Sequence, residues 1–271
     1  MKKYLAVIIF VLLTGCTGQY MLWFPIISIP HELTPYELTP YKPVPAPYKL
    51  IPPGYYISEQ TEIPQYDQGP NQRRPMVALT FDDGPSRHTE RILDLLEEYG
   101  GRATFFVVGS RVRSHNNTVA RAADMGNEIA NHSFSHANLT LLSEYAIKRE
   151  IQLASGAIEA VVGFSPTIMR PPFGAVNNRV ERVAGDMGYS IIIWNLDTLD
   201  WKYRNPTRIY NVIMSKVQDG SVILLHDLHE TTADAMEQVI PRLVSEGYHL
   251  VTVSELLEYF NGELEPGIVY N

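Results

Sequence analysis

The sequence has a single cysteine, Cys16, among its 271 residues, which excludes an intramolecular disulfide. It also lacks a basic block. Lysine and arginine number 22 against 30 aspartates and glutamates, so the formal net charge is −8 and the pI is about 5.5. This balance argues against a nucleic-acid partner. No glycine-rich phosphate loop follows the first predicted strand, 76–81, which argues against nucleotide binding.

A long hydrophobic run is missing as well. The apolar run 5–13 is too short for a comfortable membrane span, and two lysines before it and small residues after it give the layout of a secretory signal. The run ends in Leu-Thr-Gly-Cys16, which resembles a bacterial lipoprotein signal, in which cleavage before the cysteine leaves a thiol to be lipidated. We therefore expect 1–15 to be a signal peptide and lipidated Cys16 to hold an exported protein at the surface of a bacterial envelope membrane. The alternative is a plain signal peptide, or an uncleaved anchor, with an incidental cysteine.

Residues 16–75 are rich in proline and tyrosine and contain an imperfect tandem repeat of Glu-Leu-Thr-Pro-Tyr at 32–36 and 37–41. Repeated prolines interrupt helices and central strands alike, so this segment is predicted to be an extended linker. Its tyrosines and Trp23 offer an alternative role, which is docking on the folded domain or on a glycan.

The remaining sequence alternates between short apolar runs and amphipathic stretches. Strands are predicted at 76–81, 103–108, 128–130, 167–169, 190–194, 221–225 and 249–253. Helices are predicted at 89–99, 119–125, 143–162, 178–187, 207–217 and 233–245. Such alternation favours an α/β domain of parallel strands and crossover helices, either a barrel or a doubly wound sheet. We expect this domain to span 76–260 and leave 261–271 as a tail.

Unusual polar motifs follow five of the predicted strands. In chain order they are DDG, NHSFSH, RPPFG, DTLDW and HD. In a barrel these strand ends form one mouth, where active sites are found.

The first motif sets Asp82 and Asp83 side by side, where they serve one pocket only if the chain bends, which Gly84 makes easy. Adjacent carboxylates raise one pKa unless a cation takes one of them as a ligand and leaves the other as a base. The alternative is a simple capped turn.

His132 and His136 are four residues apart, which places both imidazoles on one face if the segment turns helically. With Asp83 they would supply two histidines and one carboxylate to zinc and leave positions open for water and substrate. A surface or capping pair of histidines is the alternative.

The other motifs suit positioning and proton transfer. Arg170 precedes a rigid Pro-Pro corner, and such rigidity suits a side chain that must hold another side chain in place. The alternative is a solvated arginine on the surface. His226 ends a strand, and Asp200 from a neighbouring loop would tune its imidazole for proton transfer near neutral pH. Trp201 is interpreted as a pocket wall. Any of these residues taken alone could instead be structural.

Taken in order, TFDDGP, HSFSH, RPPFG, DTLDW and LLHD resemble the five motifs of the polysaccharide deacetylases, carbohydrate esterase family 4, which share the NodB homology domain. The resemblance covers about 76–259. It implies a distorted (β/α)7 barrel, similar to a TIM barrel, that removes acetyl groups from N-acetylglucosamine polymers or from acetylated xylan.

The resemblance also implies a role for each matching residue. Asp82 would be the general base, held by Arg170, and His226 the general acid, tuned by Asp200. The metal, zinc or alternatively cobalt, would be held by Asp83, His132 and His136. Substrate contacts would come from Pro172, Phe173, Gly174, Trp201 and Leu224. The third motif of the family often has tyrosine where this sequence has Phe173. The resemblance implies that this position contributes its backbone N–H to the oxyanion, and phenylalanine keeps that group.

These observations favour a metal-dependent N-deacetylase of an extracellular N-acetylglucosamine polymer, with peptidoglycan the first choice because of the predicted anchor and linker. An O-acetyl esterase acting on xylan or another acetylated glycan is the nearest rival. A non-enzymatic glycan-binding wall lipoprotein built on a decayed barrel is the second.

Overall fold

The computed structural model describes residues 73–271. The predicted signal peptide, Cys16 and the linker as far as residue 72 lie outside the described residues. Between residues 73 and 271, no helix combines the length and the apolar character needed to cross a membrane.

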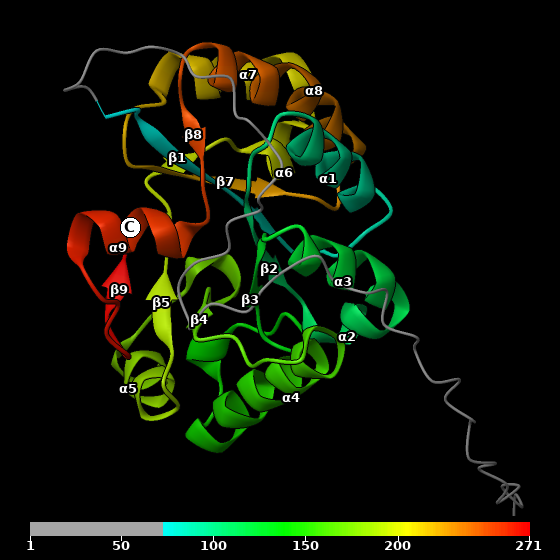
Figure 1. The fold of residues 1–271 in the computed structure, drawn as a ribbon. Coiled ribbons are helices and arrows are strands. Elements are labelled where there is room, and N and C mark those ends of the chain that lie inside the picture. The colour runs from blue at the N-terminus through cyan, green and yellow to red at the C-terminus, as the bar shows by residue number, and fades with distance from the viewer. Residues whose placement is uncertain (1–72) are drawn as a thin grey trace, which may run out of the picture. The chain divides into compact units, whose positions relative to one another are not determined.

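The described chain alternates strands and helices, as the apolar pattern predicts (Figure 1). The strands are β1 (Met76–Asp82), β2 (Thr104–Val107), β3 (Glu128–Asn131), β4 (Ile168–Met169), β5 (Ser190–Ile192), β6 (Leu196–Asp197), β7 (Ser221–His226), β8 (His249–Leu250) and β9 (Val269–Tyr270). The α-helices are α1 (Thr89–Glu98), α2 (Gly109–Val112), α3 (Asn116–Asp124), α4 (Glu144–Val162), α5 (Asn178–Asp186), α6 (Asp200–Tyr203), α7 (Pro206–Lys216), α8 (Glu230–Ser245) and α9 (Val253–Asn261). Three 3₁₀ turns complete the set: η1 (Arg113–His115), η2 (Leu139–Leu141) and η3 (Pro172–Gly174).

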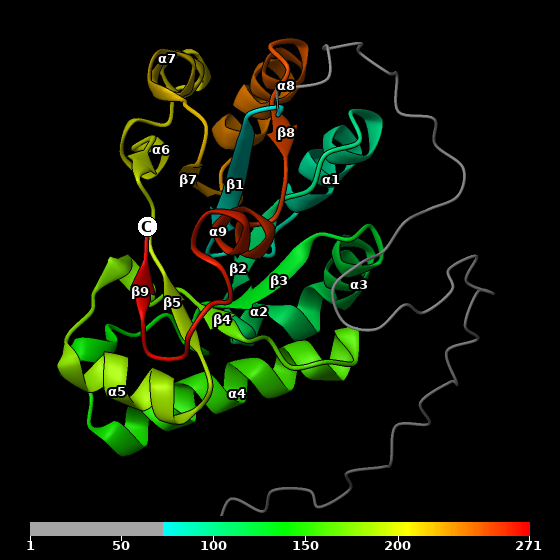
Figure 2. The same ribbon diagram turned by 60° about the vertical axis from the view of Figure 1, so that its left-hand side comes forward.

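The strands form one parallel sheet in the order β6-β7-β1-β2-β3-β4-β5-β9, and β8 pairs with the start of β1. The sheet curls into an incomplete barrel with α1, α3, α4, α5 and α8 on its outside and α9 within the curl (Figures 1 and 2). Among the described residues no pairing joins β6 to β5 or β9, so the barrel is open there. The distorted (β/α)7 barrel is therefore confirmed.

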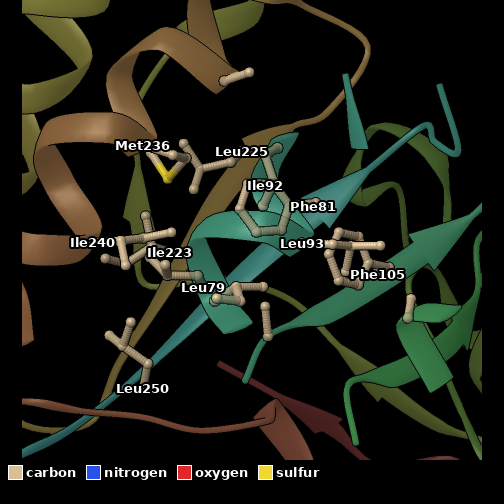
Figure 3. Close-up of a cluster of buried hydrophobic side chains, with 14 of the residues drawn as sticks. Leu79, Phe81, Ile92, Leu93, Phe105, Ile223, Leu225, Met236, Ile240 and Leu250 are labelled. Carbon is tan, nitrogen blue, oxygen red and sulfur yellow. The ribbon is translucent and has the colours of Figure 1, made fainter. Parts of the chain in front are cut away.

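Side chains of β1 alternate between two hydrophobic clusters, one between the sheet and its helices and one inside the barrel. Leu79 and Phe81 point outward into the cluster between the sheet and its helices, where Phe81 stacks on Phe105 at 5.2 Å between ring centroids (Figure 3). Ala78 points inward to the smaller cluster inside the barrel. Thr80 and Asp82 share that inward direction, so the alternation that fills the core also delivers a carboxylate to the barrel mouth.

The C-terminal region differs from its prediction. The strand predicted at 249–253 ends at Leu250, because Thr252 and Glu255 form a capping box that begins helix α9. The buried face of α9, which includes Val253, Leu256 and Leu257, packs against the cluster inside the barrel. The segment 261–271, expected to be a tail, carries β9, which pairs with β5. A strand of two residues gives too short a pattern to be recognised in a sequence.

The segment 265–270, which includes β9, is held to residues 189–193 by at least four hydrogen bonds. The backbone N–H groups of Ile191 and Ile193 donate to Ile268 and Tyr270, that of Gly267 donates to Tyr189, and the Ser190 hydroxyl donates to Glu265. We predict that deleting residues 263–271 lowers the free energy of unfolding by about 4 kcal/mol, at about 1 kcal/mol for each bond. Urea denaturation measures this, and a loss below about 1 kcal/mol would contradict the assigned role of β9.

Candidate active site

A buried ion pair lies inside the barrel mouth. Asp82 ends β1 and is 3% exposed, while Arg170 follows β4 and is fully buried. Arg170 Nη1 donates to Asp82 Oδ1 at 2.7 Å and to Thr80 Oγ1 at 2.8 Å. A buried charge requires such compensation, so the pair fixes both side chains.

The remaining donors of Arg170 are also satisfied. Nε donates to the carbonyl of Ile192 at 3.1 Å and Nη2 to that of Ile193 at 2.9 Å. The guanidinium lies 4.1 Å from the ring centroid of Phe106 and 5.5 Å from that of Trp194. The alternative of a solvated surface arginine is therefore wrong. The Pro-Pro corner gave no sign that the side chain runs inward among aromatic rings.

The bend that separates the two acids falls on Asp83, which has φ 71°, and not on Gly84 as expected. Gly84 is required for another reason. A Cβ at this position would lie 2.2 Å from Oδ1 of Asp227, whose buried carboxylate fills the space beside the turn. Thr89 Oγ1 donates to Asp227 Oδ2, and the Ser86 hydroxyl donates to the Asp227 carbonyl at 2.5 Å. Asp227 therefore ties the end of β7 to the turn that carries Asp83.

Asp83, His132 and His136 form a group whose potential ligand atoms all lie within 4.8 Å of one another. Asp83 Oδ1 is 3.3 Å from His132 Nε2 and 2.9 Å from His136 Nε2, yet it is a buried oxygen without a hydrogen bond. Burial raises the pKa of Asp83, but the two histidines outweigh burial and hold that pKa well below its usual value. His132 Nδ1 lies 2.6 Å from the carbonyl of Arg170, which orients Nε2 toward the group. An orphaned carboxylate oxygen and two converging imidazoles fit a divalent metal ion.

The loop that carries His132 and His136, the histidine loop, is not helical, although a helical turn was expected to bring the two imidazoles to one face. Ser133 and His136 both have φ 61°, so the loop reverses sharply. Glu150 on α4 supports it by accepting hydrogen bonds from the backbone of Phe134 at 3.0 Å, the backbone of Ser135 at 2.8 Å and the Ser135 hydroxyl at 2.9 Å. Convergence of the imidazoles thus depends on α4, the α-helix that follows the loop in sequence.

Buried Asn131 anchors the start of this loop. Its side-chain amide donates to the Ile151 carbonyl and to Ser155 Oγ on α4, and its oxygen accepts from the backbone of Ser133. The loop is therefore bound to α4 at both Asn131 and Ser135.

A second pair lies at the end of β7. His226 Nδ1 is 2.8 Å from Oδ1 of the buried Asp200. Asp200 Oδ2 accepts hydrogen bonds of 2.7 Å from both the backbone of His226 and the hydroxyl of Thr232. Burial lowers the pKa of His226, but the hydrogen bond and charge of Asp200, with smaller contributions from Asp82 and Asp83, raise it to about 9. This imidazole is protonated at neutral pH.

Sheet register brings the two pairs together. Asp82 of β1 is directly opposite His226 of β7, and paired residues of neighbouring parallel strands project to the same face of a sheet. Leu224, two residues earlier on β7, projects to that face as well and is buried. A carboxylate and a protonated imidazole therefore face one space from adjacent strands.

The mouth is bordered by aromatic residues. Phe173 is 67% exposed and its ring packs edge-on against His136 at 4.7 Å, whereas Pro172 is buried. Gly174 lies against Trp194, which a Cβ would approach to 2.7 Å. Trp201 is 48% exposed, and its backbone N–H donates to Asp200 Oδ1 at 2.8 Å.

Backbone strain is concentrated at this mouth. Within the described part of the chain, the non-glycine residues with positive φ are Asp83, Ser133, His136, Phe173, Leu199 and Arg204. All of them belong to the segments that follow the barrel strands. Such conformations persist only where surrounding contacts enforce them, and they are typical of functional sites.

The structure thus brings together the residues that the sequence predicts to be catalytic, metal-binding and substrate-binding, while Cys16 lies outside the described residues. Sequence reasoning missed the residues that support them, chiefly Thr80, Glu150, Trp194, Asp227 and Thr232. Asp227 had a signal, because it adjoins His226 at the end of an apolar strand. Glu150 had none, because an exposed-looking glutamate on a long helix is ordinary.

Comparison with known proteins is consistent with this geometry. Residues 69–192 match the family model for polysaccharide deacetylase. The chain is 44% identical over 190 residues to the peptidoglycan-N-acetylmuramic acid deacetylase PdaC of Bacillus subtilis, a match that covers 70% of this chain and 40% of PdaC. This chain therefore spans about two fifths of the length of PdaC.

A relative of similar size is a peptidoglycan-N-acetylglucosamine deacetylase of Bacillus cereus. It is 35% identical over 196 residues, which cover 70% of this chain and 91% of the relative. Among solved structures, a family 4 acetyl xylan esterase from Clostridium thermocellum in complex with a cobalt ion matches with a TM-score of 0.68 and 33% identity, covering 72% of this chain and 98% of that one.

The support of the histidine loop by Glu150 generates a prediction. We expect Glu150→Ala to weaken the binding of a divalent metal ion, probed with Zn²⁺, about 10- to 100-fold, because the loop that carries His136 loses three hydrogen bonds. Isothermal titration calorimetry of the metal-free protein measures this affinity.

Glu159→Ala is the matched control. Glu159 is on the same helix, but its carboxylate accepts from Ser165 outside the site, so zinc affinity is expected to stay at the wild-type value. Equal affinities for the Glu150→Ala variant and the wild type would contradict the supporting role.

Proposed function

Because the chain belongs to the polysaccharide deacetylase family, we propose that it is a metal-dependent N-deacetylase that hydrolyses the acetamido group of N-acetylglucosamine residues in peptidoglycan and releases acetate. The observation that carries this proposal is the pairing of Asp82 with His226 across adjacent strands, beside a group suited to bind a metal. Amide hydrolysis needs a base for water and an acid for the amine, and these two residues supply both functions from one side of the sheet.

Asp82 is the proposed general base. Arg170 holds its Oδ1, whereas Oδ2 faces the metal-binding group, 3.8 Å from His132 Nε2. The oxygen nearest to the incoming water is therefore free to accept its proton. Arg170 keeps the carboxylate oriented through the reaction, because its own position is fixed by Thr80 and by the carbonyls that follow β5.

Asp83, His132 and His136 would hold the metal ion. A divalent ion at this position supplies Lewis-acid chemistry, which acidifies water and polarises the acetyl carbonyl. Zinc is our first choice for a site with two histidines and one carboxylate, with cobalt as the alternative. The cobalt ion in the Clostridium thermocellum relative supports that choice of candidates.

His226 is the proposed general acid. The amine is a poor leaving group until it is protonated, and Asp200 keeps the imidazole charged while holding Nδ1, so that Nε2 donates the proton. The backbone N–H of Phe173 stabilises the negative charge that develops on the acetyl oxygen. Pro172, Gly174, Trp201 and Leu224 are proposed to border the acetylated sugar.

Peptidoglycan is proposed as the substrate because both peptidoglycan deacetylases described above share this domain. The predicted lipid anchor at Cys16 and the linker would place the domain outside the bacterial membrane, within reach of the cell wall. N-acetylmuramic acid is the alternative sugar, since PdaC is named for it.

An O-acetyl esterase is the second candidate function. It is supported by the likeness to an acetyl xylan esterase, since an acetyl ester places its carbonyl before the same groups. Acetate release from acetylated xylan, but not from peptidoglycan or chitin oligosaccharides, would favour it. A metal-loaded protein that releases no acetate from any of these glycans would favour the non-enzymatic binding module.

Metal removal gives the first test. We predict that a chelator abolishes acetate release from peptidoglycan and that Zn²⁺ or Co²⁺ restores it, because Asp83, His132 and His136 then regain their ion. Acetate is measured enzymatically after dialysis. Full activity in protein shown by elemental analysis to be free of metal would refute metal dependence.

The pH profile gives the second test. His226 has a pKa of about 9, so the acid is available below that value and activity is expected to fall as the pH rises through about 9. Asp200→Asn removes the charge that raises this pKa while burial still lowers it, so the alkaline limb is expected to move below pH 7 and the maximal rate to fall by about 100-fold.

The controls for the pH test are the metal content and the fold of the Asp200→Asn variant. The His226–Asp200 pair also stabilises the fold below about pH 6.5, and this contribution is lost as the pH rises through about 9, so circular dichroism must show a folded variant at each pH. An alkaline limb at the same pH in both proteins would contradict the assignment of His226.

A further inference from the structure

A cationic segment begins beside the general acid and has no role in the mechanism above. Between Trp201 and Ser215 the charged side chains are Lys202, Arg204 and Arg208, and the sequence has no aspartate or glutamate there, although the net charge of the chain is −8. All three are exposed. Among residues 73–271, none of the three forms a salt bridge.

Their positions are defined by aromatic contacts. The guanidinium of Arg208 lies 3.8 Å and the ammonium of Lys202 lies 5.2 Å from the ring centroid of Tyr203. Arg204 has φ 47°, and its Nε donates to the carbonyl of Trp201 at 2.8 Å. The charges are therefore gathered around Trp201 and Tyr203 on and next to α6, which reduces the entropy lost when they bind a ligand.

Two residues of this segment, Trp201 and Arg204, lie next to the groups that end β7. Trp201 is bonded through its backbone to Asp200, the partner of His226. The ring of His229 is 6.2 Å from that of His226, and burial and then the charge of Arg204 lower the pKa of His229. Arg204 is thus close to the imidazoles that end β7 and begin α8.

We propose that Lys202, Arg204 and Arg208, which we call the cationic rim, bind a carboxylate carried by the glycan beside the acetylated sugar. The inference rests on the proposed function, because it states that the preferred substrate of the same site is negatively charged. Arginine presents parallel N–H donors that match a carboxylate, and the exposed Trp201 offers a flat apolar surface to a sugar ring.

Peptidoglycan carries carboxylates of two origins. One is the lactyl group of muramic acid, which is free where the peptide has been removed, and the other is the stem peptide. Chitin oligosaccharides carry neither. The cationic rim therefore makes the domain selective for acidic glycans over neutral ones, and this selectivity weakens as salt screens the exposed charges.

The experiment compares kcat/KM for acetate release from three substrates: soluble peptidoglycan strands with intact peptides, the same strands stripped of peptides by an amidase, and chitin tetrasaccharide. For Arg204→Gln/Arg208→Gln we expect the ratio of acidic to neutral kcat/KM to fall about tenfold, as the loss of two exposed ionic contacts implies, mainly through KM. If kcat/KM falls only for the peptide-bearing strands, the carboxylate belongs to the stem peptide. If kcat/KM falls for the stripped strands, the carboxylate belongs to the lactyl group.

Lys216→Gln is the control for the loss of an exposed positive charge elsewhere on the helix that carries Arg208, because Lys216 lies at the far end of α7. It should leave the acidic-to-neutral ratio at the wild-type value at both 20 and 300 mM salt. An unchanged ratio in the Arg204→Gln/Arg208→Gln variant, with acetate still released, would overturn the cationic rim alone. If the wild-type protein releases no acetate, the proposed function fails. The cationic rim is then tested by calorimetry, which measures how tightly the same variants bind the two acidic strands and chitin tetrasaccharide.

Discussion

The buried ion pair between Arg170 and Asp82 is the constraint on which the site depends. A guanidinium with no solvent exposure inside a barrel is tolerated only when its charge and its donors are matched. Asp82 supplies the charge, while Thr80 and the carbonyls of Ile192 and Ile193 accept the remaining donors. These carbonyls belong to the chain segment that β9 holds in place. The carboxylate that we propose as the general base is therefore oriented by contacts that extend as far as Tyr270.

The neighbouring acids Asp82 and Asp83 have different surroundings, and for this reason we propose different roles for them. Asp82 is neutralised by Arg170 within the sheet, whereas the positive φ of Asp83 turns its carboxylate toward two imidazoles. Two other parts of the site are supported by helices outside the sheet. Glu150 of α4 holds the histidine loop, and the Thr232 hydroxyl of α8 donates to Asp200, the partner of His226. Strained residues at the mouth persist because these contacts enforce them.

The sequence predicts the architecture well, because buried parallel strands and amphipathic helices leave strong periodic signals, and it predicts the site because polar motifs follow the strand ends. The failures have identifiable causes. Val251 and Val253 suggest a strand, but the capping box of Thr252 and Glu255 begins a helix. The inward course of Arg170 and the support from Glu150 are tertiary facts that neighbouring residues do not encode. The bend was expected at Gly84, whereas Asp227 occupies the space that requires glycine there.

The central claim is that Asp82, held by Arg170, is the base, and Asp82→Asn tests it most directly. Asparagine keeps the shape of the side chain and an oxygen for Arg170, but it does not accept the proton. With zinc content equal to that of the wild type and a folded protein by circular dichroism, acetate release from peptidoglycan is predicted to fall at least about 100-fold. A fully metal-loaded Asp82→Asn variant that releases acetate at the wild-type rate would contradict the account.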